Sequence, residues 1–303
     1  MKERLNWAVL GTGVIANQMA QALQKMGKPL YAVGNRTYEK AVAFAEKYGV
    51  QKVYSEIDEM FTDENVDIIY ITSPHNTHYA FMKKALLHGK HLFVEKSIAL
   101  NSRELDEMIA LAREKNLILA EAMTIWHMPI YKKLWETVKS GSLGKVQMIT
   151  MNFGSFKEYN MNNRFFNMNL AGGAMLDIGV YALSIVRSFM EETPTNILSQ
   201  WKPSPTGSDE QATVLLQNSL GQMATVALSM HSKQPKRAMI SCEKGYIEIM
   251  EYPRADKAVI VDAETGARTE VAAGSTADAL YYEMLDMEHA VQTRDASAMC
   301  LGY

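Results

Sequence analysis

A glycine-rich turn near the N-terminus constrains the fold of this chain more than any other feature of its sequence. It follows an apolar strand-like segment, residues 7–10, precedes an amphipathic helical stretch, residues 15–26, and consists of Gly11, Thr12, Gly13, Val14, Ile15 and Ala16. Gly11 permits a tight turn, Gly13 lets the backbone approach a pyrophosphate, and Ala16 allows the helix to pack closely on the strand. The helix N-terminus then presents free N–H groups to phosphate oxygens. The pattern predicts a dinucleotide-binding turn, with an ordinary tight turn between strand and helix as the alternative.

The remaining segments predict two domains. Up to about residue 121, strand-like and helical segments alternate, as they do in a doubly wound parallel sheet. From about residue 196 to residue 271, strand-like segments separated by turns predominate, which is typical of an antiparallel sheet. A chain of 303 residues is long enough for two hydrophobic cores. We therefore expect an α/β Rossmann domain over residues 1–121 and an α+β domain with an open, mainly antiparallel sheet over residues 122–303.

The composition excludes several classes of protein. A net charge of −3 argues against nucleic-acid binding, which a basic patch usually accompanies. No apolar run approaches the length of about 20 residues that a membrane-spanning helix needs, so no membrane association is expected. The two cysteines, Cys242 and Cys300, have neither the spacing of a disulfide framework nor that of a metal site, which suits a reducing cytosol. We expect a cytoplasmic protein that acts on a small molecule.

The end of the second predicted strand bears on the choice of dinucleotide. Domains specific for NAD usually carry an acidic residue there, which binds the ribose 2′-hydroxyl. This chain instead has Asn35, Arg36 and Thr37, and its first acidic residue follows only at Glu39. Arg36 would pair with a 2′-phosphate and stack on the adenine, while Asn35 and Thr37 would donate hydrogen bonds. The segment favours NADP over NAD; the alternative is a solvated loop arginine.

A polar turn follows the fourth predicted strand. It contains Ser73, Pro74, His75, Asn76 and His78. Because ligands bind beyond the carboxyl ends of the strands in an open parallel sheet, this turn is expected beside the nicotinamide ribose. His78 is expected to begin the next helix and to close over the cofactor. His75 and His78 lie three positions apart, as zinc ligands do, but no third ligand or carboxylate cluster accompanies them, so no metal site is predicted.

The fifth predicted strand, residues 91–94, ends in Glu95 and Lys96. A lysine at this position would face both the nicotinamide and the substrate, which indicates hydride transfer coupled to proton transfer. A base must remove a hydroxyl proton as hydride leaves the same carbon, and a neutral lysine amine can do so. Considered alone, Lys96 would be a solvated lysine at the end of a strand. The surrounding pattern favours the catalytic role.

In this order and along nearly the whole chain, the motifs resemble those of the Gfo/Idh/MocA family, named for glucose–fructose oxidoreductase, inositol dehydrogenase and rhizopine catabolism. The motifs that carry the resemblance are the glycine-rich turn, Pro74, Asn76, His78, Glu95, Lys96 and the segment 172–181, which reads Gly-Gly-Ala-Met-Leu-Asp-Ile-Gly-Val-Tyr. The resemblance implies an NAD(P)-dependent oxidoreductase that acts on a sugar, a polyol or a vicinal diol. It also implies a homodimer or homotetramer assembled through the sheet of the C-terminal domain.

The resemblance assigns roles to individual residues. Lys96 matches the family lysine that handles the substrate hydroxyl proton, and Glu95 matches the acidic neighbour that helps to orient this lysine and the cofactor. Asp177 matches the aspartate of the substrate domain. Tyr181 stands where many members have histidine. A tyrosine at this position resembles the subgroup that contains glucose–fructose oxidoreductase and the dihydrodiol and xylose dehydrogenases. Ser97 replaces the usual proline, which is expected to loosen the local turn.

Further side chains are candidates for contact with the substrate. Asp177 and Tyr181 are four positions apart, so on a helix they share one face. Tyr181 would then bind a hydroxyl or relay a proton, and Asp177 would orient the substrate; the alternative is an aspartate at a helix N-terminus with a packed tyrosine. Trp126, His127 and Arg164 are weaker candidates. Packing at the domain junction is the alternative for the first two, and a solvent-facing loop position for Arg164.

The resulting prediction is an NADP- or NAD-dependent dehydrogenase or reductase in which Lys96 accepts and donates the proton. Two rivals stay open. One is a dinucleotide- or sugar-sensing regulator without turnover, and the other is an NAD-dependent glycoside hydrolase of the same fold. Members of the family usually continue with one more helix after the position of residues 300–303. The C-terminal domain is therefore expected either to be shortened or to lack that element.

Overall fold

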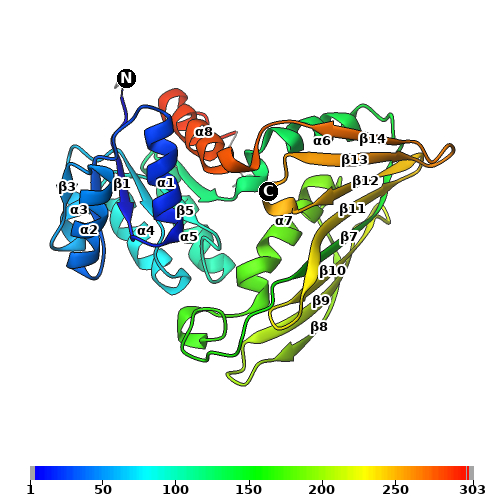
Figure 1. The fold of residues 1–303 in the computed structure, drawn as a ribbon, viewed down its shortest axis with the longest axis horizontal. Helices are drawn as coiled ribbons and strands as arrows, with labels where there is room; N and C mark the ends of the chain where they lie inside the picture. Colours follow the sequence, from blue (N-terminus) through cyan, green and yellow to red (C-terminus); the bar gives the residue numbers. More distant parts are fainter. Residues whose placement is uncertain (1–3, 298, 300–303) are drawn as a thin grey trace. The chain divides into compact units, whose positions relative to one another are not determined.

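The computed structural model describes residues 4–297 and residue 299, and its contacts divide the chain into two compact units (Figure 1). Unit 1 contains the described residues up to Met123 and those from Leu280 onward. Unit 2 contains Thr124–Ala279. The sequence placed the residues from 280 onward in the second domain, whereas in the structure they are grouped with the first. The predicted tail at residues 300–303 lies outside the described residues.

Unit 1 is built around a six-stranded parallel sheet with the order β3-β2-β1-β4-β5-β6. The strands are β1 (Trp7–Leu10), β2 (Ala32–Gly34), β3 (Lys52–Val53), β4 (Ile68–Ile71), β5 (His91–Glu95) and β6 (Leu119–Ala122). The order reverses beside β1, because the chain first adds β2 and β3 on one side and then β4 on the other. In such sheets ligands bind beyond the carboxyl ends of the strands at this reversal. The predicted Rossmann fold is confirmed.

Helices cover both faces of this sheet, because successive side chains of a buried strand point to opposite faces and both sets are apolar here. The set that includes Val9 and Phe93 packs on α1 (Val14–Lys25), α2 (Tyr38–Tyr48) and α8 (Ala279–Thr293). The set that includes Leu10 and Val94 packs on α3 (Ile57–Thr62), α4 (His78–Leu87) and α5 (Ser102–Glu114). The helices do not cover the carboxyl ends of the strands, and the turns that carry the predicted site residues lie there.

Helix α8 joins unit 1 through apolar and polar contacts. Leu280 and Met287 are buried in the same core as Trp7. The indole Nε1 of Trp7 donates a hydrogen bond to Glu288 Oε1 (3.0 Å), and Lys28 forms an ion pair with the same carboxylate. A buried carboxylate is costly unless it is paired, so these two partners fix Glu288, and with it α8, against the sheet.

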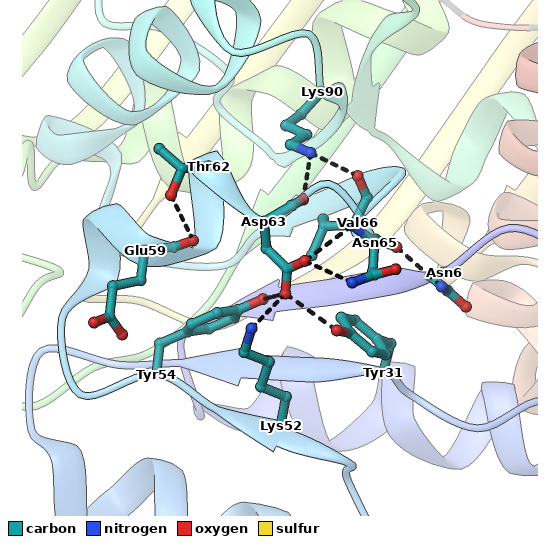
Figure 2. A network of polar contacts seen from close by, with 10 residues as sticks. All are labelled: Asn6, Tyr31, Lys52, Tyr54, Glu59, Thr62, Asp63, Asn65, Val66 and Lys90. Atoms are coloured by element: carbon teal, nitrogen blue, oxygen red, sulfur yellow. Dashed lines mark hydrogen bonds and ion pairs between the residues drawn. The ribbon is translucent and has the colours of Figure 1, made fainter.

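Figure 2 shows the Asp63 carboxylate, directly after α3, surrounded by donors from neighbouring segments. Its Oδ2 accepts hydrogen bonds from Tyr54 OH (2.7 Å), Lys52 Nζ (2.7 Å) and Tyr31 OH (3.1 Å). Its Oδ1 accepts one from the backbone N–H of Asn65 (2.9 Å). Burial by itself would raise the pKa of Asp63, but these hydrogen bonds outweigh it and hold the pKa well below the usual range.

Asp63→Asn is expected to lower the free energy of unfolding by about 3 kcal/mol, because it removes the buried charge on which these donors converge. A carboxyl group with a lowered pKa stabilises the fold above its unfolded pKa of about 3.9, and this contribution is lost as the pH falls towards the folded pKa. The difference between wild type and variant should therefore shrink below about pH 4. Denaturant unfolding at a series of pH values measures it.

Asp58→Asn is the matched control for this measurement. The Asp58 side chain is 67% exposed and pairs with Lys84 at 2.7 Å. Removal of this surface charge should change the free energy of unfolding by less than about 0.5 kcal/mol. Equal losses in the two variants would mean that the carboxylate of Asp63 contributes no more than a surface ion pair.

Unit 2 contains an eight-stranded sheet with the order β14-β13-β12-β11-β7-β10-β9-β8. The strands are β7 (Val146–Gly154), β8 (Asn196–Pro203), β9 (Asp209–Gln217), β10 (Met223–Ser229), β11 (Gln234–Cys242), β12 (Gly245–Met250), β13 (Lys257–Asp262) and β14 (Arg268–Ala272). Neighbouring strands are antiparallel except β7 and β10, which are parallel. With α6 (Pro129–Lys139) and α7 (Val180–Phe189), this confirms the predicted α+β fold.

The two faces of this sheet differ in character. Helix α7 packs against the central strands β7, β10 and β11 on one face, as Figure 1 shows. The other face, which we call the open face, carries apolar side chains of β7, β9 and β10 that are partly exposed: Met148 (41%), Leu215 (41%) and Met223 (37%). Alternation along each strand produces this division, since residues of one parity face the helix and residues of the other parity face away from it.

One helical segment, Met168–Phe189, is apolar and long enough to span a membrane by length and composition, although no such run was expected. It contains a 3-10 turn, η3 (Met168–Leu170), a non-helical stretch at residues 171–173, a π-helical turn, η4 (Met175–Gly179), and α7. Length and composition are weak evidence, because the core helix of a globular domain passes the same test. The packing of α7 on the sheet accounts for its apolar character.

Candidate functional site

The turn between β1 and α1 requires glycine at its first position. Gly11 has a φ of 115°, a value that favours glycine, and its N–H donates to Gly34 O (2.8 Å). A Cβ at residue 11 would lie 2.5 Å from Thr72 Oγ1. Thr72 follows β4, and its hydroxyl donates to Leu10 O (3.1 Å). Glycine at this position thus lets the ends of β1, β2 and β4 approach one another.

Gly13 leaves the N-terminus of α1 open. It has extended backbone, no side chain caps the helix, and a Cβ there would meet no heavy atom within 4 Å. The Val14 side chain is 74% exposed, and Thr12 and Ile15 are half-buried. The free N–H groups of the first turn therefore face open space, which is the arrangement that binds phosphate. The turn fits the pyrophosphate of a dinucleotide.

The residues at the end of β2 form a short polar loop before α2. The Asn35 amide donates to Thr37 O (2.9 Å), and Thr37 precedes the first residue of α2. Arg36 is exposed and makes no hydrogen bond or ion pair within the part of the chain that the structure describes. Because β2 lies beside β1, Arg36 is on the same edge of the sheet as the glycine-rich turn. Its guanidinium is available to a phosphate, and the binding of a 2′-phosphate by Arg36 stays a prediction.

The polar turn after β4 is closed by its own side chains. Ser73 Oγ and Thr77 Oγ1 lie 2.7 Å apart, and the Thr77 hydroxyl donates to Pro74 O (2.7 Å). A short 3-10 helix, η1 (His75–Thr77), leads into α4. Pro74 and Asn76 are exposed on this turn, at the carboxyl end of β4. The predicted cofactor residues of this motif therefore lie on the edge of the sheet that carries the glycine-rich turn.

His78 has a structural role that the sequence did not reveal. It begins α4, as predicted, and its ring is fully buried, with Nε2 2.8 Å from Ser73 O and Nδ1 3.0 Å from Ser97 O. The ring thus joins the turn after β4 to the turn after Lys96. Burial lowers the pKa of His78, although the backbone carbonyls oppose this effect. The rings of His75 and His78 are 5.7 Å apart, and the described residues contain no group of three or more potential metal ligands.

Glu95 and Lys96 lie at the carboxyl end of β5, and both are half-buried. The Glu95 carboxylate accepts a hydrogen bond from Tyr70 OH on the neighbouring strand β4. The peptide bond between Lys96 and Ser97 is cis. Ser97 was expected to loosen this turn, but it is buried, and its carbonyl lies against the ring of His78. The segment that follows the lysine is therefore tied to α4.

Sequence reasoning missed a carboxyl group beside this pair. Glu121 is in β6, and its Oε1 accepts a hydrogen bond from the N–H of Ile98 (2.9 Å). Burial raises the pKa of Glu121 to about 7; the charge of Glu95 adds to the rise, while Lys96 and the Ile98 N–H oppose it. The only signal in the sequence was a single acidic residue within the apolar run 118–123.

In unit 2 the structure pairs two of the predicted substrate residues. Arg164 Nη1 donates to Asp177 Oδ1 (2.9 Å), and Asp177 is 8% exposed. Asp177 is part of the π-helical turn Met175–Gly179, which continues directly into α7. Such turns are rare and occur frequently at functional sites. Tyr181, in the first turn of α7, is half-buried, and its ring centroid lies 6.3 Å from that of Phe153.

The two glycines before this turn allow close backbone contacts. A Cβ on Gly172 would lie 2.9 Å from Arg164 O, and a Cβ on Gly173, whose φ is 140°, would lie 1.9 Å from Asp209 Oδ1. The Asp209 carboxylate accepts a hydrogen bond from Met175 N (2.7 Å) at the start of the π-helical turn. The glycines therefore hold the loop with Arg164 and the capping aspartate against the turn that carries the predicted aspartate.

Trp126 and His127 are buried, with 8% and 1% of their surface exposed. Trp126 ends a 3-10 turn, η2 (Thr124–Trp126), and its ring centroid lies 5.5 Å from that of Trp135 in α6. These contacts favour the packing alternative for Trp126 over stacking on a substrate.

Unit 2 also has a cavity of about 640 Å³ that is open to solvent and lies beside η4, β8 and β9. Apolar side chains predominate among its lining residues, which include Met168, Met175, Leu176, Leu183, Ile197, Trp201, Val214 and Leu216. The described residues that line it do not include Asp177 or Tyr181. The cavity is therefore separate from the side chains that the sequence assigned to the substrate.

Two family models match the chain. Residues 5–123 match the model described as an oxidoreductase family with an NAD-binding Rossmann fold, and residues 131–248 match the model of the GFO/IDH/MocA C-terminal domain. Among curated proteins, the trans-1,2-dihydrobenzene-1,2-diol dehydrogenase of Xenopus laevis is 30% identical over 262 residues, which cover 85% of this chain and 79% of the relative. The enzyme of the same name from Mus musculus is 30% identical over 251 residues, which cover 81% and 74%.

Solved structures show the same fold. A 3-ketoreductase from Actinomadura kijaniata, in complex with NADP and TDP-benzene, has a TM-score of 0.86 at 19% identity and covers 96% of this chain and 90% of its own. A levoglucosan dehydrogenase, in complex with NADH and levoglucosan, has a TM-score of 0.87 at 16% identity and covers 95% and 90%. The neighbours thus bind either NADP or NADH.

Proposed function

Because this chain belongs to the Gfo/Idh/MocA family of NAD(P)-binding oxidoreductases, we propose that it transfers a hydride between a nicotinamide dinucleotide and a sugar, polyol or vicinal diol. The observation that carries the proposal is the position of Lys96. It follows β5, on the edge of the sheet where the open N-terminus of α1 follows β1. A dinucleotide whose pyrophosphate lies at that helix would extend along this edge.

The bound nicotinamide supplies the acceptor or donor of the hydride. The N–H groups after Gly13 hold its pyrophosphate, and Arg36 binds the adenosine end. Pro74 and Asn76, exposed at the end of β4, would hold the nicotinamide ribose. Glu95, fixed by Tyr70, orients the neighbouring lysine.

Lys96 acts as the proton acceptor in oxidation and as the proton donor in reduction. In oxidation its neutral amine takes the hydroxyl proton while the hydride leaves the same carbon. In unit 2, Tyr181 binds a substrate hydroxyl, and Asp177 orients the substrate while its pair with Arg164 holds the carboxylate in place.

The relatives favour a diol or a sugar as the substrate. Two curated relatives are named for a trans-dihydrodiol, and one structural neighbour is named for an anhydrosugar. The reacting unit common to these compounds is a secondary alcohol next to a second oxygen. We also propose that two copies of the chain associate through the open face of the unit 2 sheet, because Met148, Leu215 and Met223 form a partly exposed apolar surface there.

The test is a turnover assay with NADP⁺ and NAD⁺ against a panel of trans-diols, aldoses, polyols and anhydrosugars, followed by nicotinamide absorbance. Reduction of the dinucleotide by a member of the panel supports the proposal. Binding of dinucleotide and sugar without turnover would favour a sensing regulator. Hydrolysis of a glycoside with a retained dinucleotide and no net change in absorbance would favour the hydrolase of the same fold.

Arg36→Ala is expected to weaken NADPH binding by about 10- to 100-fold and NADH binding by much less, since charge-assisted hydrogen bonds contribute about 1.5–3 kcal/mol and only NADPH carries the 2′-phosphate. Paired fluorescence titrations of the two reduced dinucleotides measure this. Arg103→Ala, an exposed arginine on α5, is the matched control and should change neither affinity. Equal losses for both dinucleotides in Arg36→Ala would show that this arginine does not read the 2′-phosphate.

A further inference from the structure

Glu121 is an acidic residue in a strand that otherwise carries apolar side chains. The strand β6 reads Leu-Ala-Glu-Ala and forms one edge of the unit 1 sheet. The residues on either side, Ala120 and Ala122, are buried, and Glu121 itself is partly buried. A carboxylate in such surroundings lowers stability unless it is compensated, so its position calls for a functional account.

The sheet register places this carboxyl beside the catalytic segment. Glu121 lies opposite Val94 in the parallel pair of β5 and β6, and registered residues point to the same face. Lys96 follows directly after β5, and its charge acts on the Glu121 carboxyl, so the two side chains are near neighbours. The hydrogen bond from Ile98 N–H to Glu121 Oε1 (2.9 Å) then fastens the segment that follows the lysine.

The charges around Glu121 make its ionisation sensitive to the lysine. Burial is the main cause that raises its pKa to about 7, and repulsion from Glu95 raises it further. The Ile98 N–H and the charge of Lys96 act in the opposite direction. Near neutral pH both forms of this carboxyl are populated, so it can gain or lose a proton whenever the charge on the lysine changes.

We propose that Glu121 is the positioning residue of Lys96 and the group with which this lysine exchanges its proton. The inference rests on the proposed function. In oxidation the substrate hydroxyl gives its proton to the Lys96 amine, the resulting ammonium gives it to the Glu121 carboxylate, and the carboxylic acid releases it to water. In reduction the proton moves in the opposite order. The amine is thereby restored after each turnover, and no oxidant or reductant beyond the dinucleotide is needed.

The first test compares wild type with Glu121→Gln across the pH range. The amide oxygen can still accept from Ile98 N–H, so the turn keeps its hydrogen bond while the ionisation is lost. The expected result is a drop in kcat for oxidation of about tenfold or more, with dinucleotide affinity and KM within about twofold of wild type. In wild type, kcat for oxidation is expected to rise with pH through about pH 7 as Glu121 ionises. This rise should be absent from the variant. Glu107→Gln, at an exposed carboxylate on α5, is the matched control and should retain the wild-type profile.

A second readout does not depend on turnover. NMR of protein labelled with ¹³C-glutamate should show one carboxyl signal that titrates with a pKa of about 7 and is missing from Glu121→Gln. In Lys96→Met the same signal should titrate at higher pH, because the charge of the lysine that lowers the pKa of Glu121 is gone.

These outcomes separate the inference from the proposed function. The inference is overturned if Glu121→Gln keeps the wild-type rate and pH profile, or if the titration of Glu121 is unchanged in Lys96→Met. The proposed function alone fails if wild type turns over no member of the substrate panel while the pKa of Glu121 in the NMR titration still rises in Lys96→Met. That result would support the electrostatic coupling between Glu121 and Lys96 and would contradict the proposed hydride transfer.

Discussion

Replacement of Lys96 with methionine is expected to lower kcat by about 10²–10⁴-fold while dinucleotide affinity stays within about twofold of wild type. Methionine fills a similar volume without an ionisable group. The lysine follows β5, whereas the pyrophosphate is assigned to the start of α1, so the substitution leaves the main binding contacts of the dinucleotide in place. Single-turnover kinetics with the best substrate of the panel and a titration with NADPH measure the two quantities separately.

Lys96→Arg sharpens this test, because a guanidinium keeps the positive charge but cannot act as a base at neutral pH. If the lysine transfers a proton, both variants lose turnover; if it contributes only its charge, Lys96→Arg retains most of it. Lys83→Met, at an exposed lysine of α4 paired with Glu107, serves as the control for the substitution itself and should be fully active. Wild-type rates in Lys96→Met would remove this residue from the mechanism.

Gly13→Asp is expected to weaken the binding of NADPH and NADH by about 10²–10³-fold, because it places a carboxylate against the pyrophosphate and a like-charge contact costs several kcal/mol. The fold itself should tolerate the change. A Cβ at this residue meets nothing within 4 Å, the φ of −75° is open to any residue, and no side chain caps α1 in the wild type. Aspartate is a favoured cap, so the free energy of unfolding should stay the same or rise by about 1 kcal/mol.

Two alanine variants serve as controls for Gly13→Asp. Gly13→Ala should bind nearly as wild type does, which separates the effect of charge from that of bulk. Gly11→Ala should destabilise unit 1, because its Cβ would lie 2.5 Å from Thr72 Oγ1 and its φ is positive. Thermal unfolding and paired titrations distinguish the three variants. Unchanged dinucleotide affinity in Gly13→Asp would move the phosphate site away from the N-terminus of α1.

The parts of the site that follow from local backbone geometry could be predicted from the sequence. The glycine-rich turn is one such part, because the need for a positive φ at Gly11 and for space at Gly13 is set by the turn itself. The position of Lys96 is another, since the alternation of strands and helices determines which residues follow a parallel strand. Neither prediction required knowledge of contacts between distant segments.

The parts that depend on distant contacts could not be predicted in this way. The sequence treated Arg164 and Asp177 as separate candidates, and only the fold shows that they form an ion pair. His78 was assigned to the cofactor, although its ring nitrogens lie against two backbone carbonyls of unit 1. Glu121 was overlooked, because its raised pKa arises mainly from burial by segments distant in the sequence, with a further rise from Glu95 on β5. Such effects appear only when the register of the sheet is known.

The attachment of α8 to unit 1 has a consequence for the order in which the protein can fold during synthesis. All of unit 2 is translated between residues 123 and 280, so the nascent Rossmann sheet is complete long before its last covering helix exists. Until then the face that includes Trp7 lacks Leu280 and Met287, and its indole lacks the Glu288 acceptor. The ribosome therefore holds an N-terminal unit with one partly uncovered apolar face, a state that chaperones recognise, until α8 emerges.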